Sequence, residues 1–110
     1  MQINVSVQFK TPDAHGAGDG TVIYENNEFV IMSKGMAARL MFGALGAALA
    51  KGKEVMRFRV EDIASCKSFR KLLANYMSMT LKDGSTLTFN YPKKVEEELQ
   101  SIVASVPQEY

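Results

Sequence analysis

Apolar and polar residues alternate along much of this chain, which is the pattern of β-strands with one buried face. In residues 2–9, the apolar positions Ile3, Val5, Val7 and Phe9 alternate with polar ones. Further β-rich runs cover residues 21–33, 55–60, 63–70, 76–82 and 85–91. Tight turns at Asn26-Asn27, within the first of these runs, and at Asp83-Gly84, before the last, suit hairpins, because Asn and Gly tolerate positive φ. The pattern therefore predicts seven strands, with a Pro- and Gly-rich loop over residues 11–20.

The period of the pattern changes near the end of the chain. After Pro92, the apolar positions follow a helical spacing, and the opposite face carries acidic and amide side chains. Pro107 is expected to end this helix, which would cover residues 93–106 with the apolar face Val95, Leu99, Ile102, Val103 and Val106. Seven antiparallel strands and one amphipathic C-terminal helix predict a mainly β fold, a strongly bent barrel or orthogonal sandwich. We expect residues 1–110 to form one domain.

One segment, MAARLMFGALGAALAKG at residues 36–52, departs from both patterns. It has no polar side chain from Leu40 to Ala50, yet it is too short for a transmembrane helix and contains Arg39. We expect a helical or hairpin insert between the third and fourth strands. Three kinds of cover remain open: the domain's own barrel, a second copy of the chain, or a membrane surface contacted by the flanking cations. The predicted partner or membrane contacts are Leu40, Phe42, Leu45 and Leu49.

Composition narrows the range of functions. The 110 residues are 46% hydrophobic and 23% charged, with a net charge of +1, so no nucleic-acid partner is expected. A local excess of cations over residues 51–71 makes Arg57 and Arg59 candidate anion contacts. The lone Cys66 and a start without signal-peptide features favour a cytoplasmic protein, or a peripheral one at the inner membrane face.

Candidate chemistry is sparse. The stretch from Asp13 to Asp19 resembles the D-x-x-G-A-G-D signature of ribokinase-like sugar kinases, but that chemistry needs a helix where this chain continues as a strand. His15 has no second histidine or nearby nucleophile, and Cys66 is expected to be a small packed residue. We therefore predict no catalytic, cofactor-binding or metal-binding residues, and no enzyme activity.

Several short motifs carry a family resemblance. The hairpin GTVIYENNEFVIMSKG, the insert GALGAALAKGK, the following VEDIAS and the late LKDGSTLTF resemble bacterial GRAM-like, pleckstrin-homology-like domains over residues 20–106. This resemblance implies a seven-stranded barrel with a capping helix. Many pleckstrin-homology domains bind inositol phosphates between strands one and two, but here Lys10 is accompanied by Asp13 and Asp19, so we expect no phosphate cage.

The resemblance also implies a binding function. We expect a non-enzymatic binding or scaffolding module for protein–protein association, including self-association. The alternative is a peripheral module that binds anionic lipid, and a peptide adding to a strand edge beside the final helix is a further way of binding.

Overall fold

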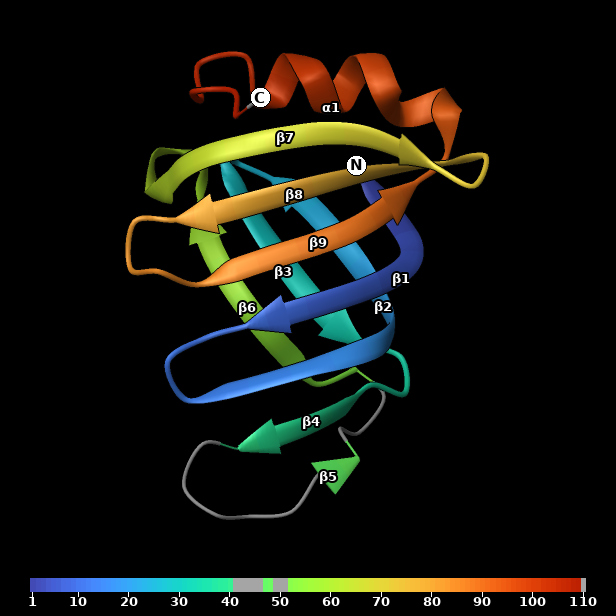
Figure 1. Ribbon diagram of the computed structural model, residues 1–110, viewed down its shortest axis with the longest axis vertical. Coiled ribbons are helices and arrows are strands. Elements are labelled where there is room, and N and C mark those ends of the chain that lie inside the picture. The colour runs from blue at the N-terminus through green and yellow to red at the C-terminus, as the bar shows by residue number, and fades with distance from the viewer. Residues whose placement is uncertain (41–46, 49–51, 110) are drawn as a thin grey trace.

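The computed structural model describes residues 1–40, 47–48 and 52–109 of the chain. Antiparallel strands dominate it (Figure 1). In chain order the strands are β1 (Gln2–Lys10), β2 (Ala14–Glu25), β3 (Glu28–Ser33), β4 (Ala37–Leu40), β5 (Ala47–Ala48), β6 (Glu54–Arg59), β7 (Ile63–Lys71), β8 (Ala74–Leu81) and β9 (Thr86–Tyr91). Two 3-10 turns, η1 (Val60–Asp62) and η2 (Lys93–Val95), precede β7 and the helix α1 (Glu96–Ile102).

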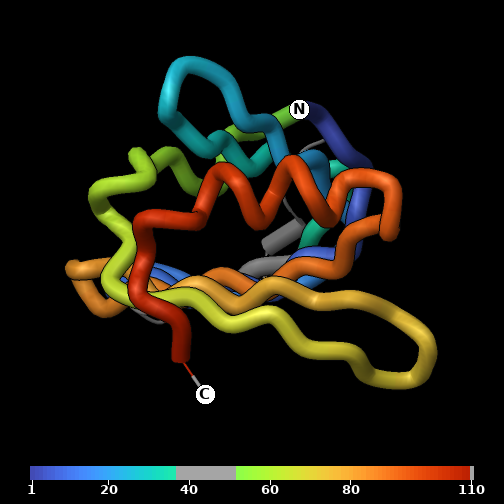
Figure 2. The backbone as a smooth tube through the Cα atoms, turned by 90° about the horizontal axis from the view of Figure 1, so that it is seen from above, coloured from blue at the N-terminus to red at the C-terminus, as the bar shows by residue number. Residues whose placement is uncertain are grey.

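Two antiparallel meanders make up the barrel-like sheet. The first runs β1-β2-β3-β6 and the second β7-β8-β9. Pairing of β1 with β9, from Val7 opposite Phe89 to Lys10 opposite Thr86, joins the two meanders. The sheet curls, and α1 lies across its open top (Figures 1 and 2). The seven strands of these two meanders, with one C-terminal helix, form the mainly β arrangement that the sequence predicts.

The core lies between the curled sheet and α1. In β1 every second residue is buried, as the alternation predicts. The helix contributes Leu99, and Val103 and Val106 are buried just beyond its end. The apolar face is therefore predicted correctly, but α1 is shorter than residues 93–106. The β-branched pair Ile102-Val103 favours helix weakly, and the turns that follow lead into Pro107.

The predicted loop over residues 11–20 is confirmed for residues 11–13 and wrong for residues 14–20, because β2 already begins at Ala14. Backbone pairing on both sides offsets the poor strand preference of its glycines. Along one edge, His15 to Ile23 pair with β1; along the other, Ala14–Ala17 pair with β4 and Gly20–Glu25 with β3. Strand β2 thus pairs with the barrel strands β1 and β3 and also with β4, which is part of a hairpin outside the barrel.

That outlying hairpin is the described part of the apolar insert. Residues 37–40 and 47–48 are the strands β4 and β5, so the hairpin alternative holds for them and the helical one does not. Met36, at the start of the insert, is only 1% exposed and packs into the core. A Cβ atom on Gly18 would lie 2.8 Å from the Met36 Cα, so glycine allows the two backbones to approach.

Candidate functional site

The apolar insert extends the sheet outward from the barrel. Pairing of Ala17 with Ala37 and of Ala14 with Leu40 fixes β4 against β2, and β5 then pairs with β4 (Figure 1, bottom). Leu40 is thus the last residue of β4. The other predicted contacts, Phe42, Leu45 and Leu49, lie outside the described residues. No described helix is long and apolar enough to span a membrane.

The candidate anion contacts already have carboxylate partners. The Arg57 guanidinium donates to Glu54 at 2.7 and 3.0 Å and to Glu28, and these hydrogen bonds, that of Glu54 foremost, raise the arginine pKa. The Arg59 side chain lies 3.9 Å from the Glu61 carboxylate. An external anion would have to compete with these carboxylates, so the local cation excess in the sequence overstates the free positive charge here.

The Gly-rich stretch does not form a phosphate-binding loop. It is strand β2, and His15 lies opposite Lys10 on one side and Arg39 on the other. Within the part of the chain that the structure describes, no three His, Cys, Asp or Glu side chains gather as a metal site.

Cys66 is packed in the core, as predicted. Burial raises the pKa of its thiol, and the Gln108 amide donates to its Sγ at 3.0 Å. The backbone of residues 107–109 runs parallel to β7 at this point: the Cys66 N–H donates to the Pro107 carbonyl, and the Glu109 N–H donates to the Cys66 carbonyl. The strand edge beside the helix, where a peptide could add, is thus occupied by the chain itself at Cys66.

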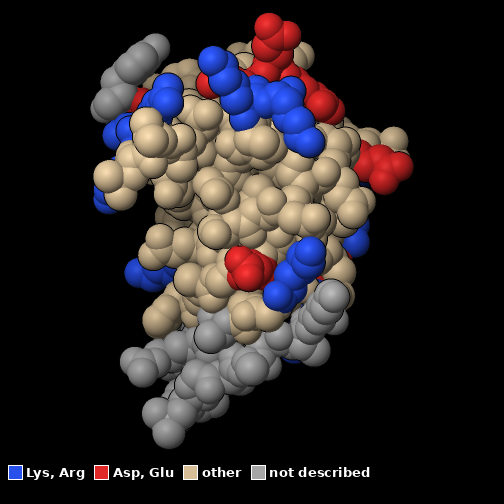
Figure 3. Space-filling view, turned by 90° about the vertical axis from the view of Figure 1, so that its right-hand side faces the viewer, with Lys and Arg blue, Asp and Glu red and all other residues tan. Residues whose placement is uncertain are grey.

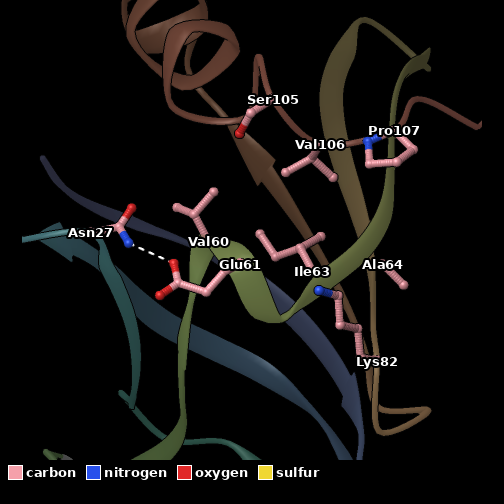
Figure 4. Close-up of a pocket in the computed structure, with 9 residues that line it drawn as sticks. All are labelled: Asn27, Val60, Glu61, Ile63, Ala64, Lys82, Ser105, Val106 and Pro107. Carbon is pink, nitrogen blue, oxygen red and sulfur yellow. Dashed lines mark hydrogen bonds between the residues drawn. The ribbon is translucent and has the colours of Figure 1, made fainter.

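A pocket of about 420 Å³ lies between η1, the start of β7 and the segment after α1 (Figure 4). Val60, Ile63 and Val106 supply apolar surface. Its charged groups are the Lys82 ammonium and the Glu61 carboxylate, which accepts a hydrogen bond of 2.6 Å from the Asn27 amide. This lining can contact a small ligand but brings no nucleophile and base together. Its full lining is Asn27, Val60, Glu61, Ile63, Ala64, Lys82, Ser105, Val106 and Pro107.

The tip of the β7–β8 hairpin is a surface that the sequence patterns do not single out. Leu72 and Leu73 form the turn, and they are 90% and 87% exposed. The sequence does contain one sign of this surface. Two adjacent leucines lie between two predicted strands, where turn residues such as Asn or Gly are expected. Alternation gives no hint of it, because residues 71–75 fall between two runs.

Comparisons with known proteins show a structural likeness. The chain is similar to the solved structure of the pleckstrin homology (PH) domain of USP37, with 13% sequence identity and a TM-score of 0.49. This likeness covers 94% of the present chain and 93% of the other. No family model matches the sequence, and no curated protein matches it.

Proposed function

We propose that this chain is a non-enzymatic binding module that associates with other proteins, and with copies of itself, through the insert at residues 36–52. The observation that carries the proposal is the β4–β5 hairpin, which continues the sheet beyond the barrel. Met36 anchors one end of the insert in the core, so the apolar residues that follow are attached to a rigid support.

The geometry of this hairpin suits pairing between copies. Strand β5 ends the order of strands β5-β4-β2-β1-β9-β8-β7, and in the described residues it pairs only with β4. An edge strand offers backbone donors and acceptors to a second edge, and a two-fold axis would place two such hairpins side by side. The apolar side chains of the insert would then contribute the contact area that a stable dimer needs.

The sequence motifs support a finer assignment, to the bacterial GRAM-like group of pleckstrin-homology-like domains. The lone, buried Cys66 is compatible with a reducing cytoplasm. We include the GRAM-like assignment and a cytoplasmic location in the proposal.

Light scattering tests the self-association. We expect the wild-type protein to be a discrete oligomer at micromolar concentration and Leu45→Asp/Leu49→Asp to be a folded monomer. The matched control is Leu72→Asp/Leu73→Asp, which makes the same chemical change at another leucine pair and should leave the oligomer intact. A monomeric wild type would overturn the proposal, and so would a 45/49 variant that unfolds, because the insert would then belong to the core.

A further inference from the structure

The β7–β8 hairpin carries the most conspicuous unexplained feature of the described surface. Leu72 and Leu73 are its exposed large hydrophobic residues, and both are almost fully accessible. The hairpin projects beyond the helix and the rest of the sheet (Figure 2). Two leucines at a projecting tip are not covered by their own domain. They can be buried only by contact with an apolar surface outside the domain.

The backbone conformation of this turn is unfavourable for leucine at both positions, which lowers the stability of the fold. Leu72 and Leu73 have φ angles of 51° and 68°, in the left-handed region that disfavours bulky side chains. The β2–β3 hairpin has nearly the same angles, 53° and 64°, but uses Asn26 and Asn27, which tolerate them. The same chain thus contains the suitable residues for this turn, and the strained leucines point to a role in binding.

Cations without acidic partners lie beside the tip. The hairpin at residues 63–82 contains no Asp or Glu, and of its cations Arg70 and Lys71 lie next to the turn, Lys67 lies further back on β7 and Lys82 lies at the opposite end. Lys67, Arg70 and Lys71 are exposed, and among the described residues none of them forms an ion pair, in contrast to Arg57. The side of the molecule toward which the hairpin points has Lys and Arg atoms along its upper part, with acidic atoms at its top and right margin (Figure 3).

An aromatic pair lies behind the cations. Phe69 and Tyr76 face each other across the two strands and stack, with ring centroids 5.2 Å apart and planes 10° from parallel. Both rings are half-buried. A strand rises roughly 3.3 Å per residue, so the pair lies about 10 Å behind the tip. Tyrosine rings favour the boundary between apolar chains and water.

We propose that the β7–β8 hairpin is a membrane-inserting element for anionic bilayers. Leu72 and Leu73 enter the upper acyl region, Arg70 and Lys71 meet lipid phosphates, and Tyr76 lies at the level of the headgroups. The apolar tip, the cation layer and the aromatic layer are spaced over about the 5–10 Å depth that interfacial insertion requires. The exposed Arg70 and Lys71 favour an anionic lipid surface over an uncharged protein groove.

This surface is separate from the insert at residues 36–52, so the inference goes beyond the proposed function. It also differs from the expectation that the insert and Arg57 and Arg59 contact lipid. A short two-leucine tip gives weak, reversible attachment, which self-association would strengthen by presenting two tips to one membrane.

Vesicle co-sedimentation tests the proposal. We expect the wild type to bind phosphatidylcholine vesicles that contain phosphatidylserine at low salt, and to bind pure phosphatidylcholine far less. Leu72→Asn/Leu73→Gly should bind the anionic vesicles at least about tenfold more weakly, while its fold becomes more stable because Asn-Gly suits this turn. Arg70→Gln/Lys71→Gln should also weaken binding, whereas Lys10→Gln/Lys53→Gln, with the same loss of charge, should not.

Tryptophan fluorescence reports insertion directly, because the chain has no tryptophan of its own. Leu72→Trp should shift its emission to the blue on addition of anionic vesicles. The matched control is Asn26→Trp, which places the same ring at the other hairpin tip at nearly the same φ and should show no shift.

Wild-type protein that ignores anionic vesicles would overturn the proposal, as would a Leu72→Asn/Leu73→Gly variant that binds like wild type. Light scattering on the same variant keeps the two proposals apart, because its oligomeric state should be unchanged.

Discussion

At the scale of single residues, Gly18 determines whether the insert can leave the barrel where it does. Met36 is buried against β2, and its Cα occupies space that a side chain at position 18 would need. Gly18 also has a φ of +145°, which L-residues rarely adopt. Position 18 must therefore meet two requirements, a positive φ and close approach of the Met36 backbone.

Replacing Gly18 with alanine should destabilise the fold in two ways. Backbone strain costs about 1–3 kcal/mol, and the clash with Met36 adds about 1–3 kcal/mol more. Gly35→Ala is the matched control, because Gly35 has a φ of +109° but no atom lies within 4 Å of the position that its Cβ would occupy. Urea unfolding of both variants separates the two costs, and equal losses would show that the Met36 contact is relaxed without penalty.

At the scale of elements, two hairpins have turns of nearly the same backbone conformation but different residues in them. Asn26 and Leu72 occupy equivalent turn positions, with φ of 53° and 51°, but only asparagine suits this conformation. We therefore interpret the residues of the β2–β3 turn as stabilising the fold and those of the β7–β8 turn as serving the proposed membrane binding.

Exchanging these residues should change stability in opposite directions. Leu72→Asn should raise the free energy of unfolding by about 1 kcal/mol, and Asn26→Leu should lower it by about 1 kcal/mol. Thermal denaturation monitored by circular dichroism measures both. A loss of stability in Leu72→Asn would mean that the leucine contributes to folding and would remove the argument from strain.

The elements also show what sequence alone can predict. Strands with one buried face are predictable because burial alternates with a period of two, as in β1 and β9. The start of β2 is not, because its glycines give no strand pattern and one of its two partners, β4, is distant in sequence and gives none either. Pairing with β1 and β4 overrides the local preference of glycine. Of the candidate surfaces, the insert is marked by its unbroken apolar run. The Leu72-Leu73 tip is not marked, because it looks like two more core residues until their exposure is known.

At the scale of the whole molecule, the β1–β9 pairing makes the two meanders one structure. Phe29 and Phe58 from the first meander share a single core with Met77 and Phe89 from the second. Neither meander can bury its inner face alone, since each would leave half of that core exposed to water.

Unfolding should therefore be a single cooperative transition. Met56 on β6 and Met79 on β8 are buried reporters, one in each meander. We expect their methyl resonances to disappear at the same urea concentration as the circular dichroism signal. Separate midpoints for the two methyl groups would show that the meanders are independent folding units.

The segment at residues 107–109 has a consequence for solubility. A bare β7 edge would offer the backbone groups of Cys66 to the edge of another molecule, the contact from which fibrils and amorphous aggregates grow. Here those two groups are already hydrogen-bonded to Pro107 and Glu109. Residues 107–109 thus block edge-to-edge pairing of β7 at Cys66 and reduce the tendency of the chain to aggregate there.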